Sequence, residues 1–145
     1  MTWPAPRPGL VIRYSYLWYR EAAEGQEEGR KDRPCAVILA VQDLDGGTRV
    51  YTLPITHTPP ANQQQAVEIP AVVKARLGLD SERSWIVLNE FNDFIWPGPD
   101  LRFLPGKGPE SAAYGFLPPQ LLRVVRDRFL TAIRAKKAAR VARTE

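Results

Sequence analysis

The sequence predicts one mainly β domain, a small barrel or sandwich, with a short helix and a C-terminal helix. Fourteen prolines and ten glycines divide the 145 residues into short pieces. Several of these pieces are rich in β-branched and aromatic residues, which favour strands. Two pieces instead carry helix signals, the clearer being a stripe of apolar residues at the helical period. The length suits one domain and leaves little room for two, so we expect residues 1–145 to fold as a single unit.

Four runs are predicted as strands and a fifth as a short edge strand. They are residues 10–19, 35–41, 48–56 and 84–91, with 101–104 at the edge. The run 35–41 is almost purely apolar, so we expect it to be buried on both faces. Asp45-Gly46-Gly47 is a tight-turn signal, which predicts that 35–41 and 48–56 form a hairpin.

Proline and glycine also mark the helices. Pro70 suits the first position of a short helix, and Gly78 is placed to end it in a left-handed cap. Pro118-Pro119 begins the final helix. The small and basic residues of 135–145 predict a disordered basic tail. The polar stretch 20–32 is predicted to be a long mobile loop.

The basic character is concentrated near the C-terminus. The chain has a net charge of +4, but residues 123–145 hold eight basic and two acidic residues, which leaves −2 for the rest. A basic helix can follow nucleic acid or an acidic partner, and a solvated helix face is an equally good interpretation. No run of about 20 apolar residues is present, and the N-terminus lacks signal-peptide features, so we expect a cytoplasmic protein outside membranes.

Cysteine and histidine are too few for common metal sites. Cys35 is the single cysteine and His57 the single histidine. Internal disulfides, zinc sites built on several cysteines and His-rich sites are therefore excluded. We expect no metal and no cofactor, and we expect Cys35 to be a buried small hydrophobe.

Arg33 is the first candidate for chemistry. Pro34 pushes Arg33 into an extended conformation at the entrance of a strand. A guanidinium held there can bind a phosphate through two hydrogen bonds. The alternative is an arginine that pairs with Asp32 or Glu28 at the surface.

Thr56 and His57 form the second candidate. Pro54 indicates a strand edge or strand end, so we expect Thr56 at a rim, where its hydroxyl can bond a phosphate oxygen. His57 can act as a general acid or base near neutral pH. The alternative for His57 is a half-buried histidine or a solvated loop residue. Strand alternation turns it away from Thr56 unless the strand ends there.

Carboxylates at the end of the fourth predicted strand form the third candidate. The segment is Asn89-Glu90-Phe91-Asn92-Asp93. A carboxylate at such a position can serve as a base or can cap a turn.

Taken together, these stretches resemble the PemK/MazF family of toxin endoribonucleases from type II toxin–antitoxin systems. Pro8-Gly9-Leu10-Val11-Ile12 matches the start of the family's first strand, and Arg33-Pro34 matches its Arg-Pro element before an apolar strand. Pro54-Ile55-Thr56 matches its Pro-x-Thr element, and the similarity covers most of residues 8–134. The sequence departs from the family at His57, where a small polar residue is usual, and at Leu88, where some members have an arginine.

The resemblance implies an SH3-like β-barrel, usually a homodimer, that cleaves single-stranded RNA without metal and is neutralised by an antitoxin protein. In this family the ribose 2′-hydroxyl attacks the adjacent phosphorus and leaves a cyclic phosphate and a free 5′-hydroxyl. Arg33 corresponds to the family arginine and Thr56 to its threonine. The acid falls nearest Glu90, with Asp93 as a competitor.

We therefore predict the following site. The catalytic residues are Arg33, Thr56, Glu90 and His57, and the substrate-binding residues are Arg30, Lys31, Thr58, Asn92 and Asp93. One alternative is a non-catalytic SH3-like barrel that binds RNA or protein. Another is an inhibitor of a protein target such as a topoisomerase, because a related family of barrel toxins works in that way.

Overall fold

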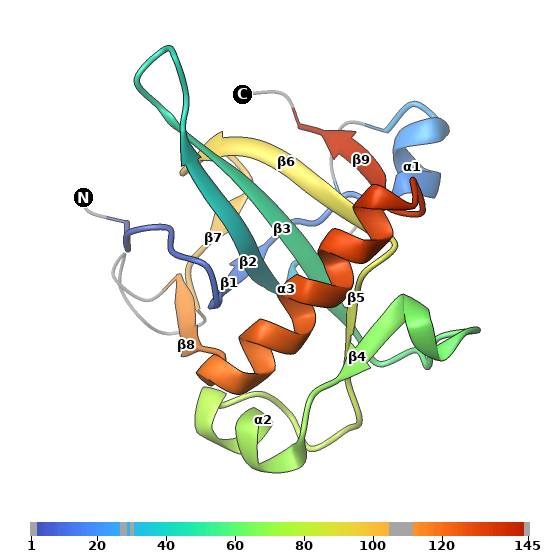
Figure 1. Cartoon of the computed structure of the whole chain (residues 1–145). Coiled ribbons are helices and arrows are strands. Elements are labelled where there is room, and N and C mark those ends of the chain that lie inside the picture. The colour runs from blue at the N-terminus through green and yellow to red at the C-terminus, as the bar shows by residue number, and fades with distance from the viewer. Residues whose placement is uncertain (1–2, 27–28, 30, 105–111, 144–145) are drawn as a thin grey trace.

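A computed structural model describes residues 3–26, 29, 31–104 and 112–143 of the chain (Figure 1). Within these residues the protein is mainly β, as the sequence predicts. The strands are β1 (Leu10–Tyr14), β2 (Arg33–Gln42), β3 (Thr48–Thr56), β4 (Ala66–Glu68), β5 (Trp85–Val87), β6 (Glu90–Trp96), β7 (Leu101–Arg102), β8 (Ala113–Phe116) and β9 (Ala139–Ala142). The helices are α1 (Tyr19–Ala23), α2 (Ala71–Leu77) and α3 (Pro119–Arg134), with a 3₁₀ turn, η1, at Gln63–Gln65.

The strands form one sheet in the order β4-β5-β3-β2-β1-β7, with β6, β8 and β9 as side branches. β3 is the branch point, because its first half pairs with β6 and its last two residues pair with β5. All neighbours are antiparallel except β6 and β9, which run parallel. Among the described residues no pairing joins the outer strands of the sheet, so the sheet is not closed into a barrel.

The predicted hairpin is present as β2 and β3. The two strands pair from Cys35↔Pro54 to Gln42↔Thr48, and Gly46 takes a positive φ of 88° in the turn. The end of the hairpin projects beyond the rest of the sheet (Figure 1). The prediction that 35–41 is buried on both faces is therefore right for its first half and wrong at Leu39 and Val41, which are exposed.

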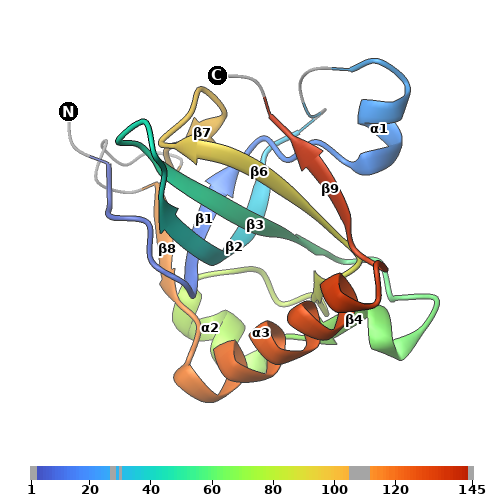
Figure 2. The ribbon, with the colours of Figure 1, turned by 45° about the horizontal axis from the view of Figure 1, so that its top comes forward.

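The core lies on both faces of the sheet. Neighbouring residues of β1, Val11 and Ile12, belong to separate buried clusters, as expected from the alternation of side chains along a strand. The first cluster packs the sheet against α2 and α3 and includes Phe129 of α3, which lies along that face (Figure 2). The second cluster holds Tyr14 and Phe94, whose rings stack 4.7 Å apart.

The short helix forms as predicted. α2 follows Pro70, and Gly78 ends it with a φ of 71°. The final helix also forms, from Pro119 to Arg134. No helix in the described ranges is both long and apolar enough to cross a membrane.

The predicted strand 84–91 is two strands. β5 ends at Val87 and β6 begins at Glu90. The break arises because β5 pairs with the end of β3, whereas β6 pairs with its beginning. The residues between them are held from outside the sheet, since Leu88 N donates to Gln65 O.

Residues 135–145 are not a disordered tail over the part that the structure describes. β9 pairs with β6 in the register Glu90↔Ala139 to Asp93↔Ala142, and Arg143 is buried. Two basic side chains of this segment form ion pairs, Arg140 with Asp93 and Arg143 with Asp100. The remaining residues, 144–145, lie outside the described residues.

The stretch 20–32 contains a helix rather than a continuous loop. α1 occupies its first residues, and Glu21 is buried with its Oε1 accepting from Trp18 N at 3.1 Å. Further on, Gly29 packs so closely that a Cβ there would lie 2.1 Å from the carbonyl oxygen of Tyr16. Residues 27, 28 and 30 of this stretch lie outside the described residues.

Candidate functional site

A cavity of about 640 Å³ opens beside the start of β2 and the end of β3. The four predicted catalytic residues, Arg33, Thr56, His57 and Glu90, all line it. Lys31 and Thr58, predicted to bind substrate, line it too. The cavity thus brings together residues from three separate stretches of the sequence. Arg30 lies outside the described residues.

Arg33 is the first residue of β2, opposite Tyr14 of β1. Its guanidinium carbon lies over the ring of Trp18, 4.9 Å from the centroid. Its Nε is buried and has no hydrogen-bond partner, the single such side-chain atom in the described part of the chain. The sequence gives Asp32 as one possible partner of Arg33. The carboxylate of Asp32 instead lies 3.5 Å from the guanidinium of Arg13 and 3.6 Å from that of Arg102.

An unmatched buried donor costs free energy unless a ligand or water satisfies it. The guanidinium of Arg33 makes no ion pair with the described residues and lies against an aromatic ring. Because Arg33 also lines the cavity, its guanidinium can present a planar fork of donors to the oxygens of a phosphate bound there.

Thr56 is the last residue of β3, where the sequence places it. Its Oγ1 accepts a hydrogen bond from Thr58 N at 3.1 Å. The hydroxyl proton is therefore free to be donated to another acceptor. Pro54, two residues earlier, is buried opposite Cys35 rather than exposed at an edge.

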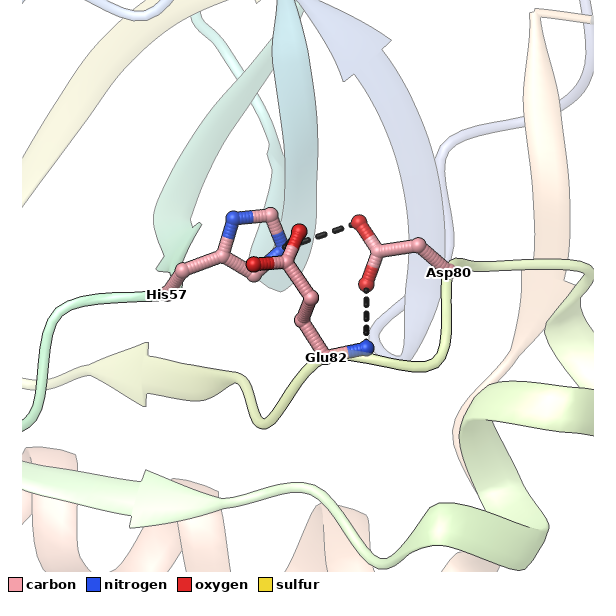
Figure 3. A group of neighbouring side chains, drawn as sticks. All are labelled: His57, Asp80 and Glu82. Carbon is pink, nitrogen blue, oxygen red and sulfur yellow. Dashed lines mark hydrogen bonds and ion pairs between the residues drawn. The ribbon is translucent and has the colours of Figure 1, made fainter.

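His57 follows β3 and has a side chain that is 51% exposed. Its Nε2 lies 2.8 Å from Oδ2 of Asp80 and 3.9 Å from the carboxylate of Glu82 (Figure 3). Asp80 is held in turn by Lys74, whose Nζ donates to its Oδ1 at 2.7 Å. The hydrogen bond from Lys74 lowers the pKa of the Asp80 carboxyl below its ordinary value, and the hydrogen bond from His57 adds to this effect.

His57, Asp80 and Glu82 also have the composition of a small metal site, since their ligand atoms lie within 4.8 Å of one another. Lys74 argues against that role. Its ammonium already places a positive charge on Asp80, which would repel a divalent cation at the same carboxylate. The donor set fits a cation poorly, and we assign no metal to it.

Glu90 is the first residue of β6 and lies half-buried at the cavity. Its Oε1 accepts from Tyr16 OH at 3.1 Å and from Tyr19 N at 2.9 Å. Burial raises the pKa of the Glu90 carboxyl above its ordinary value, against the opposite effect of the two hydrogen bonds. A carboxyl that holds its proton to higher pH is suited to proton transfer near neutrality.

Asn92 and Asp93 do not line the cavity. Asn92 is buried and bonds the backbone of Leu17 from both sides, accepting from its N–H and donating to its carbonyl. Asp93 is buried between Arg49 and Arg140, each at 2.6 Å. The expectation that these two residues join the site is not met, because β6 carries them away from Glu90 into the sheet.

The residues that line the cavity and were not predicted for the site include Trp18, Lys74 and Asp80. No motif in the sequence indicates that Trp18 lies beside Arg33. Lys74 and Asp80 lie in α2 and in the loop after it, and their only signal was an ionisable residue within and just beyond a short helix.

Comparison with models of known protein families gives no match to this chain, and comparison with curated proteins finds none similar to it.

Proposed function

We propose that the protein is a metal-independent endoribonuclease of the PemK/MazF type, acting on single-stranded RNA in the cavity around Arg33. One observation carries the proposal. Arg33 makes no ion pair with the described residues, and it lines the same cavity as Thr56, His57 and Glu90. These groups supply what transfer of a phosphoryl group within RNA requires. They are a cation that binds the phosphate, a hydroxyl that donates a hydrogen bond to it, and two groups that can transfer protons.

In the proposed reaction the scissile phosphate lies against Arg33 and accepts a hydrogen bond from the hydroxyl of Thr56. The ribose 2′-hydroxyl attacks the phosphorus, and the bond from phosphorus to the 5′-oxygen breaks. Arg33 stabilises the negative charge that grows on the phosphate oxygens. One of His57 and Glu90 takes the proton of the nucleophile, and the other group protonates the leaving oxygen.

The wider expectations belong to the same proposal. They are an SH3-like barrel as the parent fold, a homodimer as the working form, a cytoplasmic location and an antitoxin protein as the inhibitor. What supports the fold is the antiparallel order β3-β2-β1 and the pairing of β3 with both β5 and β6.

The test is cleavage of a long single-stranded RNA in EDTA by the wild type, Arg33→Ala and Arg33→Lys. We expect the wild type to give fragments with 5′-hydroxyl and cyclic phosphate ends. Loss of the guanidinium should slow cleavage by about 10²–10³-fold. Arg33→Lys should recover little, because an ammonium lacks the planar fork of donors.

Arg83→Ala is the matched control, because Arg83 also lies near an aromatic ring but pairs with Glu68 and does not line the cavity. It should cleave at the wild-type rate. Cleavage that persists unchanged in Arg33→Ala would contradict the proposal. RNA that binds without being cleaved would favour the alternative, a barrel that binds RNA without catalysis.

A further inference from the structure

Lys74 is a buried cation that has no role in the proposed reaction. It lies on α2, and its side chain is 5% exposed. Its Nζ donates to Oδ1 of Asp80 and Oγ of Ser84, both at 2.7 Å, and to the carbonyl of Glu82. All three protons of the ammonium are therefore used. Because a buried charge is costly unless paired, this network fixes Lys74 and the acceptors around it.

The network orients the carboxylate of Asp80. Oδ1 accepts from Lys74 and from Glu82 N, the second at 3.1 Å. Oδ2 is left to face His57, whose Nε2 lies 2.8 Å away. The loop after α2 thus presents one oxygen of a fixed carboxylate to the imidazole.

This contact selects one tautomer of His57. An ionised carboxylate only accepts hydrogen bonds, so Nε2 must carry the proton. In the neutral imidazole the lone pair is then on Nδ1. Figure 3 shows Nδ1 on the side of the ring that faces away from Asp80 and Glu82.

We propose that Asp80 and Lys74 are positioning residues that make His57 the general base of this site, with Nδ1 as the proton acceptor. This inference rests on the proposed function and deepens it. As in a catalytic triad, a carboxylate orients the imidazole that acts as the base. Here a buried lysine, Lys74, holds that carboxylate in place.

With His57 as the base, the proton balance makes Glu90 the general acid. The 2′-hydroxyl proton passes to Nδ1 of His57 while the bond from the 2′-oxygen to phosphorus forms. The bond from phosphorus to the 5′-oxygen breaks, and that oxygen takes the proton of the Glu90 carboxyl. The cycle ends when the imidazolium loses its proton and the Glu90 carboxylate regains one, both through solvent.

Because His57 is the only histidine, its ring nitrogens can be observed alone in the full-length protein. We would label the protein with ¹⁵N and record the ring shifts at a pH at which the imidazole is neutral. The expected spectrum of the wild type is that of the Nε2–H tautomer. Asp80→Asn should weaken this preference, since an amide can donate as well as accept. Glu82→Gln is the matched control and should keep it, because Glu82 lies 3.9 Å from Nε2.

RNA cleavage by the same variants provides the second measurement. We expect Asp80→Asn to lower kcat about tenfold or more, and His57→Gln about 10²-fold, the lower range for loss of a general base. Both side chains are about half-exposed. In Asp80→Asn the amide oxygen can still accept from Lys74, which keeps its bonds to Ser84 and to the carbonyl of Glu82, so we expect both variants to fold. Glu82→Gln should cleave like the wild type.

The outcomes separate the two proposals. An Nδ1–H tautomer in the wild type overturns the inference without any variant. Cleavage by the wild type with an equal kcat in Asp80→Asn overturns the inference and leaves the proposed function in place. RNA left intact by the wild type overturns the proposed function, and the catalytic part of the inference with it.

Discussion

Arg143→Ala tests whether the C-terminal segment is part of the folded protein. The side chain of Arg143 is 2% exposed and donates to Ser15 O at 2.8 Å, Asn92 Oδ1 at 2.9 Å and Asp100 Oδ2 at 2.6 Å. The carboxylate of Asp100 is itself 10% exposed, so the variant leaves a buried charge without this partner. Breaking such a pair costs about 3–5 kcal/mol of the free energy of unfolding. For a chain of this size that corresponds to a fall in Tm of roughly 10–16 °C.

The assay is urea unfolding followed by circular dichroism, with Arg140→Ala as the control on the same strand. Arg140 is 55% exposed, and its partner Asp93 keeps Arg49 at 2.6 Å, so the control should lose less than about 1 kcal/mol. Equal stabilities for the two variants would refute the reasoning. The sequence-based prediction that residues 135–145 are a disordered tail would then stand.

Two further predictions concern ionisable groups. Burial raises the folded-state pKa of Glu90, so ionising this carboxyl lowers the free energy of unfolding. This loss is absent below the ordinary pKa of a glutamate and complete above the raised value. Glu90→Gln should therefore raise the urea midpoint relative to the wild type at pH 7 and lose this advantage at pH 4, and an advantage confined to pH 4 would contradict this sign. Burial raises the pKa of the Cys35 thiol far above its ordinary value, so a thiol reagent should label the protein only at its rate of unfolding. Rapid labelling of the native protein would show that Cys35 is accessible.

The parts of the fold that follow from local rules were predictable. Pro70 and Gly78 bound α2 because proline and glycine act through their own backbone preferences. The turn at residues 45–47 makes the hairpin for the same reason. β4, β8 and β9 have at most four residues each, and their pairing depends on partners far away in the sequence. No local pattern shows that Ala139–Ala142 lies beside β6.

The same distinction holds for the site. Arg33 and Thr56 were predicted at strand ends, and both lie there. Pro34 follows Arg33 at the start of β2, whereas the edge position expected from Pro54 was wrong because Pro54 is buried opposite Cys35. Asp93 was misplaced because nearness to Glu90 in sequence was taken as nearness in space, whereas each residue of a strand advances about 3.3 Å. Asp80 was not predicted because its contacts with Lys74 and His57 arise only when the fold brings the three residues together.

The pairing of β1 has a consequence for the time that folding takes. Leu10 pairs with Phe116, and Tyr14 with Leu101, so β1 gains its outer neighbours only when most of the chain has come back to it. Closing such long loops costs entropy before any contact repays it, which slows folding. The β2–β3 hairpin and α3 can form from local contacts, but the second core cluster must wait for β1 to be enclosed. We therefore expect refolding on the slow side for a chain of this length, with the burial of Tyr14 among its late steps.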